Sequence, residues 1–392
     1  MRLFISAGEP SGDLHGANLA EVLRRRLPGV AIDGFGGSHM REAGVNLLYP
    51  LTELSVMWFT QTLINIDKFI HLAVQAESYF RRQRPSAVVL IDYPGFHWHI
   101  AQRAKRYGIP VYYFVPPQLW AWAGWRVHKM RRNFKAVLTA LPFEETWYRE
   151  RNVPTHYVGH PYFDEIAEQK LYPEFLAEQR AKPGEIVALL PGSRTQEVHA
   201  NFPMMVNAAK LAAAKRPGVR FLVASFKEKQ AVLAREMLRG SGLNAEVHIG
   251  RTPEIIELGA LCVAVSGSVS LELLSRLKPT IVVYKISRGF RIIARQLIRV
   301  KYISLVNLLL DRGLFPEYPT AKDESNAIAA DVLTWLEHPE LLKAVREELR
   351  ILRDRVAKPG AVERAAEFLI GELVSRDSLT PISLVGRGEL RQ

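Results

Sequence analysis

The chain contains a single cysteine and no long hydrophobic run. Cys262 lies in the apolar run 258–265, so an internal disulfide or a cysteine-based zinc site is excluded, and a small buried side chain is expected here. No segment approaches the roughly 18 uninterrupted apolar residues that span a membrane. The apolar residues near the N-terminus are too few for the core of a signal peptide. These absences predict a reducing, cytoplasmic location.

Metal-binding motifs are also missing from the sequence. No Asp-x-Asp pair occurs, and the eleven histidines form no His-Glu-x-x-His or comparable pair. His97 and His99 are two residues apart, so on a helix they would point in different directions. The sequence therefore predicts chemistry without a metal or another cofactor, in which arginine and helix ends neutralise any diphosphate leaving group.

Positive charge, by contrast, is in excess. The chain has 52 lysines and arginines against 40 aspartates and glutamates, a net charge of +12, which indicates an acidic partner such as nucleic acid, an anionic membrane or a phosphorylated substrate. The segment 287–302 carries Arg288, Arg291, Arg295 and Arg299 at helical spacing between apolar residues. This pattern favours a membrane surface or lipid headgroup, because no nucleic-acid motif accompanies it. An ordinary helix with a solvated arginine face is the alternative.

Short apolar runs alternate with longer amphipathic segments, in two series. The first series comprises residues 3–5, 87–91, 111–115 and 136–140, and the second 186–190, 220–224, 245–249, 261–265 and 280–284. This alternation is typical of parallel sheets covered by helices. Between the series, the polar region 162–184 has the character of a linker. The sequence predicts an α/β protein of two Rossmann-like domains, with ligands at the carboxyl ends of the strands and in a cleft between the domains.

The second series contains a turn suited to phosphate. Gly192, Ser193 and Arg194 follow the run 186–190 and precede a helical segment. Backbone N–H groups at a helix start attract anions, and arginine adds a fixed charge. A solvated arginine on a loop is the alternative interpretation.

A similar turn follows the run 261–265. Gly267 and Ser268 begin a helical segment, and Glu272 lies about one turn further on. A carboxylate there can accept hydrogen bonds from a ribose diol, although it also suits the helix dipole without any ligand. Two anion sites in one domain favour a nucleoside diphosphate.

In the first series, Asp92 stands where the run 87–91 ends. It is a candidate general base, and a plain turn residue is the alternative. The turn that follows residues 3–5 carries Gly8, Gly12 and Gly16 at intervals of four, which matches neither the dinucleotide fingerprint nor the P-loop. A plain turn with Ser11 or Asp13 capping the next helix is one interpretation of it.

An apolar stretch with aromatic residues lies further along the first half. It contains Val56, Met57, Trp58 and Phe59. Such a stripe usually belongs to a core. If exposed beside the turns of the first half, it could take up acyl chains.

These turns together resemble the lipid-A-disaccharide synthases, a family of inverting glycosyltransferases with two Rossmann-like domains in the GT-B arrangement. The likeness extends, in order, over most of residues 2–320. Its motifs lie at residues 6–13, 36–37 with Met40 and Gly44, 54–57, 91–96, 120–122, 141–144, 158–161, 190–194 and 302–308.

The resemblance implies a reaction and the residues that perform it. UDP-2,3-diacylglucosamine would give its sugar to the 6-hydroxyl of 2,3-diacylglucosamine 1-phosphate, forming a β-1,6 disaccharide and UDP. The family pattern places the essential aspartate at Asp92 and the essential arginine at Arg194, and the remaining expected contacts fall into two groups. Those to the nucleotide sugar are Gly192, Ser193, Arg194, Gly267, Ser268, Glu272 and Asn307, and those to the acceptor are Gly8, Glu9, Ser11, Gly12 and Asp13.

The resemblance also suggests domain limits and a location. An acceptor domain is expected over residues 1–165 and a UDP-sugar domain over 183–354, with a helix at about 355–377 returning to the first domain and a polar tail over 378–392. The UDP-sugar donor and the phosphorylated glycolipid acceptor are the expected partners, at the cytoplasmic face of the inner membrane. No nucleic acid is expected, and a homodimer is compatible with this interpretation.

The chain departs from the family pattern at three places. Val306 stands where proline is usual, the family's usual glutamine is missing near Pro319 and Thr320, and the turn 267–270 replaces a Gly-Thr-Ala pattern. Two alternatives remain open. One is another GT-B enzyme that uses a UDP-sugar, such as a different glycolipid glycosyltransferase or an epimerase. The other is a lipid-binding protein of the membrane surface without catalysis.

Overall fold

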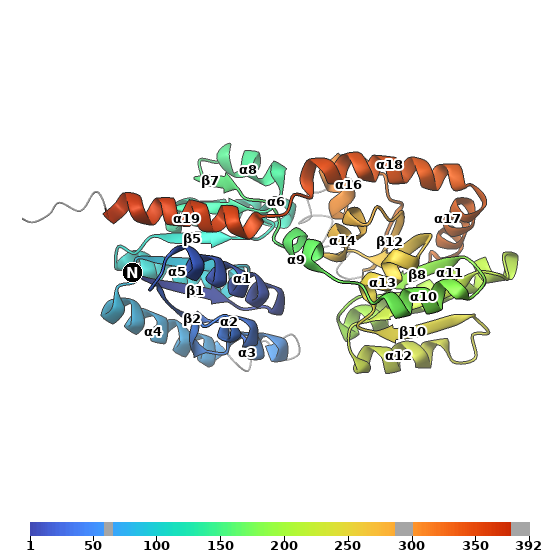
Figure 1. The fold of residues 1–392 in the computed structure, drawn as a ribbon, viewed down its shortest axis with the longest axis horizontal. Helices are drawn as coiled ribbons and strands as arrows, with labels where there is room; N and C mark the ends of the chain where they lie inside the picture. The colour runs from blue at the N-terminus through green and yellow to red at the C-terminus, as the bar shows by residue number, and fades with distance from the viewer. Residues whose placement is uncertain (59–65, 287–300, 378–392) are drawn as a thin grey trace, which may run out of the picture. The chain divides into compact units, whose positions relative to one another are not determined.

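The structure is a computed structural model that describes residues 1–58, 66–286 and 301–377; for residues 55–58, 66, 376 and 377 it describes the backbone alone. The chain divides into two compact units (Figure 1). Unit 1 comprises Met1–Pro117, Trp125–Pro161 and the chain from Gly360, and unit 2 comprises Gln118–Gly124 and Tyr162–Pro359.

Unit 1 is built on a seven-stranded parallel sheet in the order β3-β2-β1-β4-β5-β6-β7. Successive strands extend to one side from β1 and to the other side from β4, so the strand order reverses between these two. Ligands of doubly wound sheets bind beyond the carboxyl ends of the strands at such a reversal. The strands are β1 (Arg2–Ala7), β2 (Ala31–Phe35), β3 (Asn46–Tyr49), β4 (Ala87–Ile91), β5 (Val111–Phe114), β6 (Ala136–Thr139) and β7 (Thr155–Tyr157).

Helices cover the sheet of unit 1. All five residues of β4 are buried, as expected for a strand with helices on both faces. The last described helix packs against α1, where Leu369 and Leu373 join Leu19 and Leu23 in one core. The helices are α1 (Pro10–Arg26), α2 (Ser38–Glu42), α3 (Leu51–Trp58), α4 (Ile66–Gln83), α5 (Pro94–Arg106), α7 (Val127–Asn133), α8 (Pro142–Arg149) and α19 (Ala361–Asp377), with a 3₁₀ turn over Gly124–Arg126.

Unit 2 repeats the plan with six parallel strands in the order β10-β9-β8-β11-β12-β13. Here the order reverses between β8 and β11. The strands are β8 (Ile186–Leu190), β9 (Arg220–Ser225), β10 (Ala245–Ile249), β11 (Leu261–Val265), β12 (Thr280–Lys285) and β13 (Glu317–Thr320). The helices are α6 (Leu119–Trp122), α9 (Tyr162–Glu168), α10 (Pro173–Ala181), α11 (Thr195–Lys215), α12 (Glu228–Leu238), α13 (Thr252–Leu258), α14 (Val269–Ser275), α16 (Leu305–Leu310), α17 (Ser325–Glu337) and α18 (Pro339–Val356).

The prediction of a linker over residues 162–184 is wrong, because most of this region folds into α9 and α10 of unit 2. Its polar residues have partners inside the unit. Phe175 packs against the core beneath β8, and the buried Gln179 donates to Glu246 and accepts from Arg220. The polar residues of 162–184 therefore belong to helices in which some polar side chains are buried and hydrogen-bonded.

Candidate functional site

The turn after β4 holds Asp92 in a constrained backbone conformation. Asp92 and the following Tyr93 have φ angles of 49° and 50°, a left-handed region that residues other than glycine rarely adopt. The backbone carbonyl oxygen of Asp92 accepts a hydrogen bond from Tyr113 Oη at 2.6 Å and another from His97 Nδ1 at 2.7 Å. These two bonds hold the backbone of the turn in place. The half-buried side chain of Asp92 is therefore attached to an ordered backbone at the carboxyl end of β4.

His97 completes this arrangement in the neutral form. A carbonyl oxygen can only accept, so Nδ1 carries the proton, and Nε2 accepts from the Ser6 hydroxyl at 2.9 Å. Complete burial lowers the pKa of His97 to about 4, against a smaller opposite effect of the bond to Asp92. His97 is buried whereas His99 is exposed, which confirms that the two point in different directions.

Two histidines of unit 1, the buried His97 and the half-buried His160, predict a loss of stability in mild acid. Burial lowers the pKa of His97 to about 4 and that of His160 to about 3, while an unfolded chain titrates histidine near 6.5. The unfolded state therefore binds more protons below pH 6.5, so the stabilisation is complete above that value and is lost as pH falls toward 4. Between pH 7 and 5 each histidine should lower the free energy of unfolding by about 2 kcal/mol, from roughly 1.4 kcal/mol per pKa unit.

Urea unfolding at pH 7 and pH 5 measures this effect. His97→Gln serves as the comparison, since it removes one titrating group and its pH dependence should be the smaller. Equal stability of the unaltered protein at the two pH values would contradict the expectation.

The glycine turn after β1 lies against the Asp92 turn. A Cβ atom at Gly8 would fall 2.3 Å from the ring of Tyr93, so only glycine allows this approach. The interpretation in which Ser11 or Asp13 caps the helix that follows is wrong. Both residues lie inside α1, whose N-cap is Glu9, and Asp13 instead accepts from the backbone N–H groups of Gly37, His39 and Met40 at 2.6, 3.0 and 3.3 Å. Asp13 thus stabilises the start of α2 through these hydrogen bonds.

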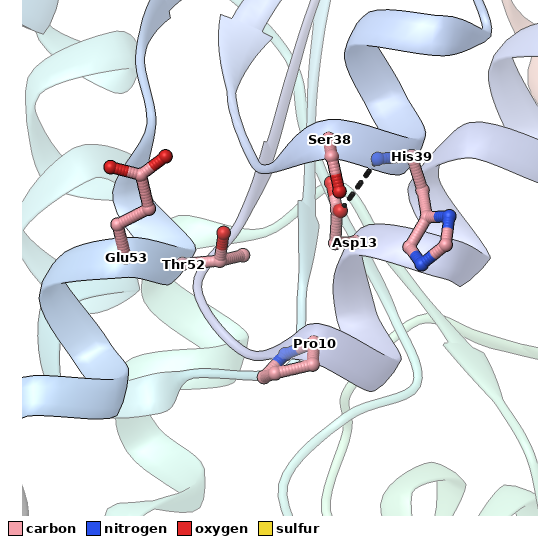
Figure 2. Close-up of a pocket in the computed structure, with 6 residues that line it drawn as sticks. All are labelled: Pro10, Asp13, Ser38, His39, Thr52 and Glu53. Carbon is pink, nitrogen blue, oxygen red and sulfur yellow. Dashed lines mark hydrogen bonds between the residues drawn. The ribbon is translucent and has the colours of Figure 1, made fainter.

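A pocket of about 390 Å³ opens beside this carboxylate (Figure 2). The first residues of α1, α2 and α3 surround it, and the bond from His39 N to Asp13 crosses one side. Its lining holds two carboxyl groups, two hydroxyl groups and an imidazole, and it includes no lysine or arginine. The lining residues are Pro10, Asp13, Ser38, His39, Thr52 and Glu53.

In unit 2, the turn after β8 places Arg194 at the N-cap of α11, half exposed. The expectation that its backbone N–H groups are open to phosphate is wrong. The N–H groups of Ser193 and Arg194 donate to Glu197 Oε2 at 3.0 and 3.1 Å, and the Arg194 guanidinium contacts Glu197 Oε1 at 3.1 Å. A side chain from the first turn of α11 therefore occupies the position expected for an anion.

The turn after β11 lies beside it in the sheet order of unit 2. A Cβ atom at Gly267 would meet open space, and Ser268 is the N-cap of α14 without a side-chain capping bond. Glu272 is buried in α14, where it accepts from Tyr162 Oη at 3.0 Å and from Arg276 Nε at 3.1 Å. Its contact with a ribose stays a prediction.

Asn307 has a different setting from the one expected of a residue that touches the nucleotide. It is fully buried in α16, its amide nitrogen donates to Phe315 O and Glu317 Oε1, and its amide oxygen accepts from the backbone of Leu314 and Phe315. Glu317 also accepts from Ile303 N and Ser304 N. Asn307 therefore shapes its own loop, and direct contact with the nucleotide stays a prediction.

This loop borders a second pocket, of about 450 Å³, in unit 2. Ser266 Oγ at the end of β11 donates to Ile303 O at 2.5 Å, which ties the loop to the carboxyl end of the sheet. The pocket is lined by Lys301, Tyr302, Asn307, Gly313, Leu314, Phe315, Pro316, Glu317 and Pro319.

Several predicted residues cannot be placed. The side chains of Val56, Met57 and Trp58, and all of Phe59, Arg288, Arg291, Arg295 and Arg299, lie outside the described residues. Cys262 is buried as expected, and burial raises the pKa of its thiol to about 12. Among the residues that are described, no three histidine, cysteine or acidic side chains are grouped to hold a metal ion, and no helix is both long and apolar enough to cross a membrane.

Comparison with known proteins places these features in context. The family model described as lipid-A-disaccharide synthetase matches residues 3–364. The chain is 34% identical over 376 residues to the lipid-A-disaccharide synthase of Myxococcus xanthus and 32% identical over 370 residues to that of Coxiella burnetii; each comparison covers 94% of this chain and 97% of the relative.

Solved structures support the fold. A Staphylococcus aureus MnaA structure with UDP has a TM-score of 0.65 at 10% identity, covering 95% of this chain and 97% of that one. The UDP-GlcNAc 2-epimerase of Neisseria meningitidis bound to UDP-GlcNAc has a TM-score of 0.59 at 12% identity, covering 96% and 100%. The predicted α/β class with two Rossmann-like units is confirmed.

Proposed function

The chain belongs to the lipid-A-disaccharide synthetase family and is a glycosyltransferase of lipid A biosynthesis, and we propose that it joins UDP-2,3-diacylglucosamine to 2,3-diacylglucosamine 1-phosphate. The products are the β-1,6-linked disaccharide 1-phosphate and UDP. The observation that carries this proposal is the match over residues 3–364, which includes both Asp92 and Arg194.

Asp92 is the general base of this reaction. It takes the proton of the acceptor's 6-hydroxyl as that oxygen attacks C1 of the donor sugar, and the bond from C1 to the diphosphate oxygen breaks with its electron pair leaving on UDP. One such displacement inverts the configuration at C1. The fixed backbone of the β4 turn supports this role, because a base acts efficiently only when it is held within reach of the proton.

Arg194 stabilises the charge that develops on the departing diphosphate. Its planar guanidinium suits phosphate oxygens, whereas the backbone N–H groups of Ser193 and Arg194 at the start of α11 already donate to Glu197. The strand order of unit 2 reverses beside this turn, where ligands of such sheets bind. Unit 2 is accordingly the donor side.

The acceptor sugar belongs to unit 1, in the pocket beside Asp13. Pro10 and Asp13 from the predicted acceptor turn line it, and its hydroxyl and carboxyl groups suit the hydroxyls of a sugar ring. The apolar stretch 56–59 is the candidate for contact with acyl chains on sequence grounds. Together with the arginines of 287–302 and the net charge of +12, this stretch supports peripheral association with an anionic inner membrane.

Mass spectrometry of the purified protein with both diacylated sugars tests the proposal. Equal amounts of disaccharide 1-phosphate and UDP are expected, with the same rate when a chelator is present. A different GT-B enzyme would release UDP with an acceptor that lacks acyl chains, or would convert the donor alone. A lipid-binding protein without catalysis would form no UDP, and either result would contradict the proposal.

A further inference from the structure

We propose that Glu197 is a positioning residue for the donor's diphosphate, acting through the turn after β8 and through Arg194. This inference rests on the proposed function, because it takes the diphosphate of a UDP-sugar as the ligand of Arg194. Glu197 itself need not touch the donor. Its task is to hold the groups that do.

The carboxylate of Glu197 connects three groups of the turn. Oε2 accepts from the consecutive backbone N–H groups of Ser193 and Arg194 at 3.0 and 3.1 Å, and Oε1 accepts from the Arg194 guanidinium at 3.1 Å. One side chain therefore fixes both the backbone and the cation of the same residue. A half-exposed arginine without such a partner would adopt many rotamers, and binding a diphosphate would then have to order it.

The surroundings are built around this carboxylate. Gly192 has a φ angle of 115°, and a Cβ atom there would lie 2.6 Å from Glu197 Cβ, so both the backbone conformation and the close approach of Glu197 favour glycine. From α12, Gln230 Nε2 donates to Ser193 O at 3.2 Å and to Thr195 Oγ1 at 3.3 Å. The turn is thus held through its N–H groups by Glu197 and through a carbonyl oxygen by Gln230.

The negative charge of Glu197 opposes a diphosphate, so the positioning role depends on how many donors the Arg194 guanidinium carries. A guanidinium has five N–H donors, so it can keep its contact with Glu197 and still present donors to phosphate oxygens. The pair is 54% exposed at Arg194 and 23% at Glu197, and an exposed pair of this kind contributes little to stability. Glu197→Ala also removes the two backbone bonds of the helix start, so it should lower the unfolding temperature as loss of a helix cap does, and the change in UDP affinity is the readout specific to positioning.

Unit 1 offers a matched control. Glu144 makes the same backbone arrangement after β6, where its Oε2 accepts from Ala140 N and Leu141 N at 3.1 and 3.0 Å. Both glutamates hold two consecutive N–H groups at a helix start. Glu144 belongs to unit 1 and is not among the residues assigned to the donor, so its replacement separates the general loss of a helix cap from a loss of positioning.

The test is calorimetric titration with UDP and thermal unfolding, on the full chain and on Glu197→Ala, Glu197→Gln and Glu144→Ala. Glu197→Ala should raise the Kd for UDP about three- to tenfold, the range for ordering one long side chain on binding. Glu197→Gln keeps one acceptor oxygen for the two backbone N–H groups but presents an amide N–H₂ to the guanidinium in place of Oε1, so it should keep the turn and recover only part of this loss. Glu144→Ala should lower the unfolding temperature and leave the Kd unchanged.

Two results would overturn the inference. Unchanged UDP affinity in Glu197→Ala would mean that the turn needs no such support. Tighter UDP binding would mean that the carboxylate competes with the diphosphate. If the unaltered protein fails to bind UDP, the proposed function itself fails, so the two failures are distinguishable.

Discussion

Replacing Asp92 by asparagine is expected to lower kcat by about 10²- to 10⁴-fold, the usual contribution of a general base. Asparagine has nearly the same size, but its amide cannot take the proton of the acceptor hydroxyl. The two hydrogen bonds that fix the turn go to the backbone carbonyl oxygen of Asp92, from Tyr113 and His97, so they survive the change. The loss should therefore appear in turnover while the unfolding temperature stays close to that of the unaltered protein.

Steady-state release of UDP from the two substrates measures this effect. Asp67→Asn is the matched control, because Asp67 is an exposed residue of α4 in the same unit and its change should leave kcat unaltered. A kcat for Asp92→Asn within a few-fold of that of the unaltered protein would remove Asp92 from the role of base.

Replacing Arg194 by alanine is expected to lower kcat/KM for the donor by about 10²- to 10³-fold, as for the loss of one donor to a charge that develops in the transition state. Lysine at this position should recover part of the loss, because it restores the charge without the planar pair of donors. Stability should change little, since the Arg194 side chain is half exposed and an ion pair at such a position contributes little.

Initial rates measured at varied donor concentration and saturating acceptor give kcat/KM for the donor. Arg350→Ala is the control, because Arg350 is an exposed arginine of α18 whose ion pairs with Glu347 and Asp354 resemble that of Arg194. If Arg194→Ala and Arg350→Ala behaved alike, the diphosphate would have to be neutralised by another group.

The sequence was sufficient to predict the strongly apolar strands. The runs 87–91 and 186–190 coincide with β4 and β8, because fully buried parallel strands are continuous hydrophobic runs. β2 was not predicted, since its residues include Asp33 and Gly34. Asp33 is nevertheless buried, where it accepts from Arg2, Asn46 and Tyr79. Only the fold brings those three partners together.

The sequence predicted which turns contain the candidate site residues. The turns after β1, β4, β8 and β11 do lie at the reversals of strand order in their units, because topology alone fixes where such turns gather. The function of each side chain within a turn depends on local partners. Glu197 stands three residues after the N-cap, but the N-cap is Arg194 and not the serine or threonine of a capping box, so its role was not evident from the sequence.

Hydrogen bonds between side chains and particular backbone groups account for what could not be predicted. His97 and Tyr113 both donate to the backbone carbonyl oxygen of Asp92, and no sequence motif predicts either bond. The amide of Asn307 is bound by the backbone of residues 314 and 315 and by Glu317, which the sequence did not predict, and its contact with the nucleotide stays a prediction. A list of conspicuous polar residues cannot separate those that contact a ligand from those that hold a loop.

The central claim is a division of labour, in which unit 1 supplies the base and unit 2 holds the diphosphate. Calorimetric titration of UDP into Asp92→Asn and Arg194→Ala tests it most directly. The account predicts that Asp92→Asn binds UDP as tightly as the unaltered protein and that Arg194→Ala binds it much more weakly. Loss of UDP affinity in Asp92→Asn, or full affinity in Arg194→Ala, would contradict the claim.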